Sequence, residues 1–237
     1  MTQSLAAIFV CRQPSAYVRA VAQALKAARP SLDVSIISDR ANVRPQAPVP
    51  EIFLSDEVCR EAGFQWTNYM DKSFSGWDRA FCHATAIDSD YCWFIEDDVV
   101  FRDPLALLAL IDHYAGSDSD VLCGEFFDME GDPGWEHWHT VAEFFPAVVA
   151  AHAFIPLCRL SRPVLRGIAE IAASHGKLCF VESMVGSLAK ALHLRAEAFD
   201  KAVARVHYRP VFTRAAAQLL LDSGVLAVHP CKEILDG

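Results

Sequence analysis

Three consecutive carboxylates, Glu96, Asp97 and Asp98, interrupt one of the most apolar stretches of the sequence. The preceding residues 91–95 have the composition of a buried strand. Charges at the end of such a strand are costly unless they meet water, hydrogen-bond donors or a metal ion, so they mark its carboxyl end. Ligands of open α/β sheets bind at that edge, and carboxylate oxygens suit Mg²⁺ or Mn²⁺ carrying a phosphate. A solvated turn is the alternative, but the apolar residues 99–101 favour a functional site.

The segments around this stretch alternate between strand-like and helix-like patterns. Apolar runs at residues 5–11 and 32–38 predict buried strands, and the spacing between them predicts a helix that stops at Pro30. This order is typical of the first half of a nucleotide-binding α/β unit. Further strands are expected at residues 120–125, 144–156, 178–180 and 224–229, and further helices at residues 75–84, 104–112, 161–173 and after 182.

The sequence of residues 94–99, Phe-Ile-Glu-Asp-Asp-Val, resembles the Asp-x-Asp region of GT-A fold glycosyltransferases, particularly the members that carry Glu-Asp-Asp. The resemblance implies a GT-A-like three-layer α/β/α sandwich with a mostly parallel central sheet. It also implies that Asp98 is a ligand of Mn²⁺ or Mg²⁺ on the diphosphate of a nucleotide-sugar donor. Glu96 and Asp97 would then contact the ribose or the donor sugar.

The same resemblance suggests further donor-binding residues. Arg12 follows the first strand and Asp39 ends the second, where members of this family commonly contact the nucleoside. A turn or helix cap is the alternative role for Asp39. Lys72 and Asp78 stand where the family often presents a basic or polar side chain to the donor, with a solvated surface lysine as the alternative for Lys72. Trp77 is predicted to be a core residue.

Glu182 is the predicted catalytic residue. It follows the expected strand 178–180 and opens a helix, so backbone donors could hold its carboxylate at the active edge. There, partly desolvated, it could act as general base on an acceptor hydroxyl. The layout is similar to that of core-2-type branching glycosyltransferases. The alternative is a helix-capping glutamate, which a position near a helix N-terminus also favours.

Two residues near the carboxyl end complete the expected donor site. Many GT-A enzymes have a C-terminal histidine in the metal shell and a nearby cation on the diphosphate, and His229 and Lys232 resemble that pair. A structural or solvated histidine is the alternative for His229.

Residues 126–139 are rich in aromatic and polar side chains and predict a shaped loop. Tryptophan rings stack on sugar faces, while histidine and aspartate bind hydroxyls, so this loop could hold a sugar. His137 and His139 could bind a metal from a strand, but no further matched ligand accompanies them.

Composition limits the class of protein. The 237 residues, 53% of them hydrophobic, suffice for a single GT-A-like domain over residues 1–237, with a nucleotide-sugar-binding half (1–101) and an acceptor-binding half (102–237). A net charge of −9 without a basic run argues against nucleic-acid binding. Eight dispersed cysteines without Cys-x-x-Cys predict reduced core residues. With neither a signal-peptide pattern nor a long apolar span, a cytoplasmic location is expected.

Together these features predict a metal-dependent glycosyltransferase that moves a sugar from a nucleotide-sugar to a hydroxyl of a glycan or other acceptor, with inversion. The sequence lacks the Gly-x-Gly-x-x-Gly, Walker and Gly-x-Ser-x-Gly motifs of dehydrogenases, NTPases and hydrolases. Two alternatives stay open. A nucleotidyltransferase would use the same carboxylates but release pyrophosphate, and a non-catalytic carbohydrate-binding protein would bind glycan without metal.

Overall fold

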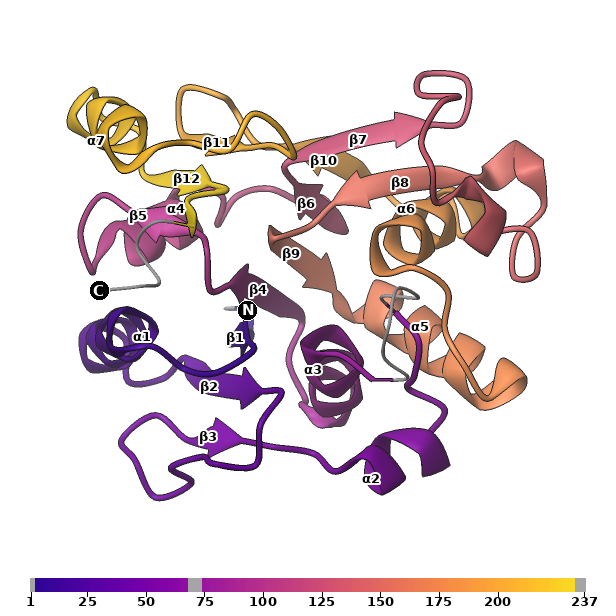
Figure 1. The fold of residues 1–237 in the computed structure, drawn as a ribbon, viewed down its shortest axis with the longest axis horizontal. Helices are drawn as coiled ribbons and strands as arrows, with labels where there is room; N and C mark the ends of the chain where they lie inside the picture. Colours follow the sequence, from indigo (N-terminus) through magenta and orange to yellow (C-terminus); the bar gives the residue numbers. More distant parts are fainter. Residues whose placement is uncertain (1–2, 68–73, 233–237) are drawn as a thin grey trace.

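The computed structural model describes residues 3–67 and 74–232. Its centre is a seven-stranded sheet of order β10-β6-β9-β4-β1-β2-β3 (Figure 1). Only β9 runs antiparallel to its neighbours in this sheet. The expected α/β fold with a mostly parallel central sheet is therefore confirmed. The strands are β1 (Leu5–Cys11), β2 (Asp33–Ser38), β3 (Glu51–Ile52), β4 (Tyr91–Glu96), β6 (Val121–Cys123), β9 (Leu157–Ser161) and β10 (Ala196–Ala198).

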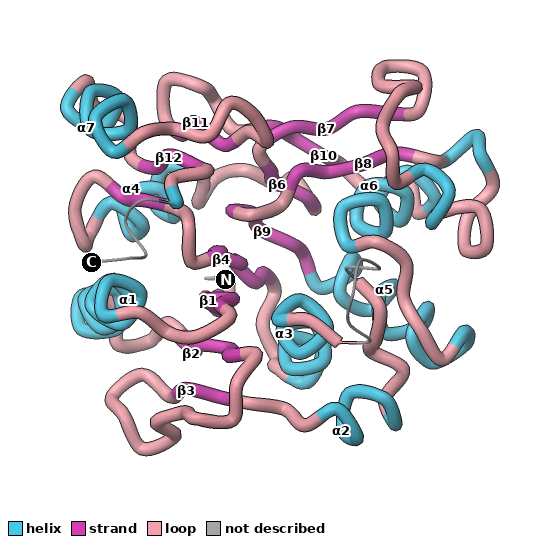
Figure 2. Tube along the Cα trace, in the orientation of Figure 1, coloured by secondary structure: helices cyan, strands magenta, loops and turns pink. Residues whose placement is uncertain are grey.

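Helices cover both faces of this sheet, as Figures 1 and 2 show. Alternate residues of a strand point to opposite faces, so β1 places Ile8 in one apolar cluster and Phe9 in the other. The Phe9 face is covered by α1 (Ala16–Ala28) and α4 (Ala106–His113). The Ile8 face is covered by α3 (Gly76–Ala86), α5 (Arg162–His175) and α6 (Val181–Ala191).

Two small sheets stand beside the central one. The first has the order β11-β12-β5, and the second pairs β7 with β8. Their strands are β5 (Val100–Phe101), β7 (Glu125–Asp128), β8 (Ala151–Phe154), β11 (Ala204–Val206) and β12 (Ala227–His229). Helix α2 (Asp56–Glu61) packs on α3, and α7 (Arg214–Asp222) packs on β12. Because β5 follows β4 after the acidic turn, its antiparallel pairing with β12 brings the end of β12 to the end of β4.

Several local predictions are confirmed at their boundaries. The first strand spans the predicted residues 5–11. Helix α1 begins after Ser15, whose side chain accepts a hydrogen bond from the Val18 N–H at 3.1 Å. Helix α5 has Pro163 in its first turn and ends at Gly176, where φ is 67°. Within the described ranges, no helix combines the length and the apolar character that crossing a bilayer requires.

Three predicted elements were wrong in extent. Residues 178–180 do not form a strand, because the segment beside them, residues 65–67, is irregular. It accepts only two isolated backbone hydrogen bonds, from Leu178 N to Gln65 O and from Val181 N to Thr67 O. The strand expected over 144–156 is confined to β8, since Pro146 fixes its own φ and precedes a short 3-10 turn. The loop expected at residue 126 begins as β7, which pairs with β8.

Gly186 lies where α6 crosses β8, and its lack of a side chain sets their separation. A Cβ at this position would stand 2.6 Å from the Ala151 carbonyl oxygen. The Ser187 hydroxyl binds the same oxygen at 3.1 Å. We expect Gly186→Ala to lower the free energy of unfolding by about 1–3 kcal/mol in chemical denaturation, because rigid backbone must shift.

The matched control is Gly116→Ala, since a Cβ at Gly116 would meet nothing within 4 Å. It should change stability by less than about 0.5 kcal/mol. Equal effects of the two substitutions would show that the contact between α6 and β8 is not close-packed.

Candidate active site

Three potential metal ligands meet at the carboxyl end of β4. Glu96 ends β4, Asp98 lies in the turn that follows, and His229 ends β12. The His229 Nε2 atom is 3.1 Å from Asp98 Oδ1 and 3.9 Å from Glu96 Oε2. One potential ligand atom from each residue lies within 4.8 Å of those of the other two. The turn and the β5–β12 pairing thus bring together residues that are far apart in sequence.

The donor set fits a divalent cation. The other ring nitrogen of His229, Nδ1, is 3.2 Å from the carbonyl oxygen of His207. In the metal-free protein, a proton on Nε2 would be donated to Asp98 Oδ1. When a cation takes its place, the proton lies on Nδ1, is donated to the His207 carbonyl, and leaves the Nε2 lone pair for the cation. Two acceptor atoms at such a distance need a proton or a cation between them. Two carboxylates with one imidazole suit Mn²⁺ or Mg²⁺ better than softer metals.

The charge of Asp98 makes the two neighbouring acids harder to ionise. Burial and the neighbouring Asp98 charge raise the pKa of Glu96 to about 7. Burial and Asp98 likewise raise the pKa of Asp97. Burial acts to raise the pKa of Asp98 too, but the hydrogen bond and charge of His229 hold it below its ordinary value. A cation placed among these groups would therefore relieve both desolvation and repulsion.

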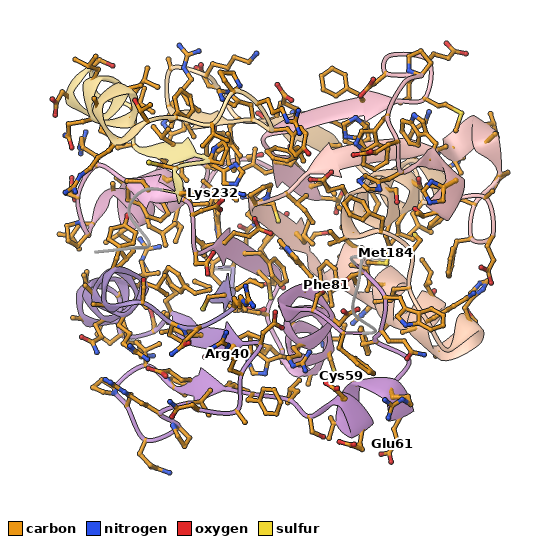
Figure 3. All side chains as sticks on the ribbon, in the orientation of Figure 1. Arg40, Cys59, Glu61, Phe81, Met184 and Lys232 are labelled. Atoms are coloured by element: carbon orange, nitrogen blue, oxygen red, sulfur yellow. The ribbon has the colours of Figure 1, made fainter. Side chains whose placement is uncertain are left out.

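A cavity of about 690 Å³ opens beside this cluster. Glu96, Asp98 and His229 line it together with Glu182 and Lys232. Figure 3 shows Lys232 on the segment that follows β12. The structure thus brings five of the residues singled out from the sequence to one cavity.

Glu182 lies in the first turn of α6, and its side chain faces the cavity. Burial, with a smaller contribution from the Glu96 charge, raises its pKa to about 8. In the described part of the chain, no backbone donor binds its carboxylate, and the N-cap residue of α6 is Phe180. The expected backbone donors are therefore absent from that part, and packing positions this side chain.

Asp97, the remaining acid of the sequence Glu96-Asp97-Asp98, is not among the residues that line the cavity. The Arg12 N–H donates to Asp97 Oδ2 at 3.3 Å, so Asp97 reaches the loop after β1. Asp39 directly follows β2 nearby, with Arg79 Nη1 at 3.7 Å from its Oδ1. Its charge also contributes to the raised pKa of Asp97, after burial and Asp98. Arg12, Asp39 and Asp97 therefore share one end of the sheet.

Two other expectations for this region have different outcomes. Asp78 is fully buried, and its carboxylate accepts hydrogen bonds from Thr67 N at 2.9 Å and Ser75 N at 2.6 Å. It closes the capping box of α3, so the expected contact with the donor was wrong. Lys72 lies outside the described residues.

Trp77 is buried as predicted, but it also has a polar role that the sequence did not indicate. Its indole Nε1 donates to Glu96 Oε1 at 2.5 Å, and its ring lines the cavity. This hydrogen bond fixes the orientation of one potential metal ligand. An amphipathic helix pattern marks Trp77 as inward-facing, but which polar atom its indole meets depends on the packing of α3 on β4.

The aromatic loop contributes part of the cavity lining. Its His137 stacks on Phe180, with ring centroids 3.9 Å apart. His139 is exposed, and the described residues contain no metal-binding group that includes either histidine. Sequence reasoning missed His152 and Arg209, which also line the cavity. They come from β8 and from the loop after β11, and nothing in their local sequences distinguishes them.

No protein-family model matches the sequence, and no curated protein resembles it closely enough to count as a match. Solved structures are similar in overall chain path. The galactosyltransferase LgtC, crystallised with donor and acceptor sugar analogs, is 14% identical, with 95% of this chain and 86% of that chain covered and a TM-score of 0.49. The glucosyl-3-phosphoglycerate synthase of Mycobacterium tuberculosis, crystallised with Mn²⁺, UDP-glucose and phosphoglyceric acid, is 11% identical, with 94% and 80% covered and a TM-score of 0.47. At such values the function has to be inferred from the site itself.

Proposed function

We propose that this protein is a metal-dependent glycosyltransferase that moves a sugar from a nucleotide-sugar to an acceptor hydroxyl with inversion. One observation carries the proposal. The cluster of Glu96, Asp98 and His229 opens into the same cavity as Glu182, a half-buried carboxyl group with a raised pKa. A cation site beside a potential general base is what transfer from a diphosphate leaving group requires.

The donor end is assigned to residues around the acidic turn. Asp98 and His229 would hold Mn²⁺ or Mg²⁺. Glu96 would assist them with one carboxylate oxygen, while its other oxygen accepts the hydrogen bond from Trp77. When bound, the cation would supply positive charge at the diphosphate leaving group. Lys232 is exposed at the cavity and adds a second positive charge for the phosphates.

The nucleoside end is assigned to the neighbouring strand ends. Arg12, Asp39 and Asp97 would bind the nucleoside and ribose, and Lys72 remains a proposed donor contact. Residues 1–101 would thus form most of the donor half and residues 102–237 the acceptor half. His229 and Lys232 are the exceptions, because β12 pairs with β5.

Glu182 would remove the proton of the acceptor hydroxyl as its oxygen attacks the anomeric carbon opposite the leaving group. A base with a pKa near the working pH combines a useful ionised fraction with sufficient basicity. Attack from the opposite face inverts the configuration. We also propose a cytoplasmic location, which the eight free cysteines, all but Cys82 buried, support.

The experiment is a thermal-shift series of the full chain against UDP-, GDP-, CMP- and dTDP-sugars, each with and without Mn²⁺. A ligand at about 100 times its dissociation constant adds about 2.7 kcal/mol to stability, which gives a clear shift. We expect one nucleotide to stabilise the protein in a metal-dependent manner and to be released as the diphosphate during transfer. Release of pyrophosphate would favour a nucleotidyltransferase instead. Metal-independent binding of glycan alone would favour a carbohydrate-binding protein.

A further inference from the structure

One part of the cavity has an unusual combination of side chains. Its wall carries the carboxylates of Glu125, Asp132 and Glu136 together with the rings of Trp135 and Phe127. We call this wall the acceptor wall. Trp135 is only partly buried, so part of its indole remains available to a ligand.

His152 adds a buried polar group to the acceptor wall. Its side chain is 6% exposed, and its ring stacks on Trp135 with centroids 4.5 Å apart and an interplanar angle of 16°. Nε2 lies 3.4 Å from Asp132 Oδ2, yet within the described chain neither ring nitrogen makes a hydrogen bond of normal geometry. Burial lowers the pKa of His152 and keeps it neutral. A neutral imidazole offers one donor and one acceptor, which is the complement of a sugar hydroxyl.

Negative charge dominates this part of the cavity. Across the described residues, the Glu125 carboxylate has no ion-pair partner, while Asp132 faces only His152 and Glu136 faces only His137. The described cations that line the cavity are Lys232 and Arg209, besides histidines.

Lys232 lies beside the metal cluster, whereas Arg209 is placed by its contact with Tyr208. Lys232 follows β12, three residues after His229. Arg209 lies against Tyr208, whose ring contacts Phe154, and Phe154 in turn contacts the ring of His229 at 5.5 Å. Lys232 therefore faces the proposed donor phosphates, and no lysine or arginine of the described residues forms an ion pair with Glu125, Asp132 or Glu136.

We propose that the acceptor is a neutral or amine-bearing sugar, and that the acceptor wall rejects acceptors carrying a phosphate or carboxylate. This inference rests on the proposed function. An anion at this wall would lose water and meet like charges, which is unfavourable on both counts. A sugar ring without negative charge can stack on Trp135, while its hydroxyls bind His152 and the free carboxylates.

The test compares three probes that differ only in the group at C6, which is neutral, positive and negative in turn: D-glucose, 6-amino-6-deoxy-D-glucose and D-glucuronate. Binding to the full chain is measured by saturation-transfer NMR at low salt, with Mg²⁺ and the nucleoside diphosphate found in the thermal-shift series. We expect glucuronate to bind at least about tenfold more weakly than the other two. Raising the ionic strength from about 0.05 to 0.5 M should bring the ratio of the glucuronate and glucose dissociation constants closer to one, because salt screens the repulsion.

A double variant tests the origin of the selectivity. Glu125→Gln with Asp132→Asn should reduce the ratio of the glucuronate and glucose dissociation constants to about threefold or less, because two charges that repel glucuronate are removed. The control is Glu61→Gln with Glu170→Gln, two exposed acids outside the cavity, and it should leave the ratio unchanged. Figure 3 places Glu61 on α2, well away from Lys232.

The outcomes separate the two proposals. If the nucleotide binds with metal, but glucuronate binds as tightly as glucose or none of the sugars binds, the acceptor inference is wrong and the proposed function stands. If no nucleotide-sugar binds, the proposed function itself fails. An unchanged ratio in a folded double variant would also overturn the acceptor inference.

Discussion

The Asp98→Asn variant is expected to lose sugar transfer by at least about a thousandfold, together with the metal-dependent thermal shift. Asp98 Oδ1 is buried at 3.1 Å from His229 Nε2, so it is the carboxylate oxygen closest to the second proposed ligand. Asparagine keeps the shape but removes the charge that a divalent cation requires. The measurements are initial rates of transfer and melting temperatures with nucleotide-sugar, with and without Mn²⁺.

The fold should survive this substitution. Asp98 raises the pKa of Glu96, so removing its charge relieves a repulsion while it weakens the hydrogen bond with His229. The stability of the metal-free protein should therefore change by no more than about 1 kcal/mol. Asp112→Asn, on the exposed end of α4, is the matched control and should transfer sugar at the wild-type rate. Substantial metal-dependent activity in Asp98→Asn would remove Asp98 from the metal site.

The Glu182→Gln variant is expected to slow the chemical step by about 10²–10⁴-fold while it binds the donor as tightly as the wild type. Glutamine is nearly isosteric but cannot accept the hydroxyl proton. Because Glu182 lies on α6 and outside the cluster of Glu96, Asp98 and His229, metal and nucleotide binding should persist. The measurements are kcat and the dissociation constant of the donor, each for the wild type and the variant. The anomeric configuration of the product is determined by NMR.

The pH profile gives an independent test of Glu182. Its folded pKa is raised to about 8 by burial, so the carboxylate form grows as the pH rises from about 6 to 9. A general base must be ionised, so the kcat of the wild type should rise with pH over this range. In Glu182→Gln this rise of kcat with pH should be absent. A cation bound near Glu96 would favour the ionised form of Glu182 and shift the rise of kcat to lower pH. Retention of the donor's anomeric configuration, or near wild-type turnover in the variant, would exclude Glu182 as the base of an inverting reaction.

Local sequence determined many of the elements. The buried strand β1, the helices α1 and α5, and the acidic end of β4 were all predicted, because hydrophobic periodicity acts within a few positions. The same rules failed at residues 178–180, where an apolar run lacks a regular partner strand. Strand composition cannot replace a ladder of hydrogen bonds.

The sequence by itself therefore determined an α/β chain with three carboxylates at the end of a buried strand. Which residues meet those carboxylates was decided by the tertiary structure. His229 reaches Asp98 through the register of β12 on β5, and Trp77 reaches Glu96 through the packing of α3 on β4. The sequence indicated that the loop of residues 126–139 could hold a sugar, but not that His152 and Glu125 would join it in one wall. Their proximity depends on strand pairings and helix contacts between segments far apart in the chain, and periodicity within one segment carries no information about that distance.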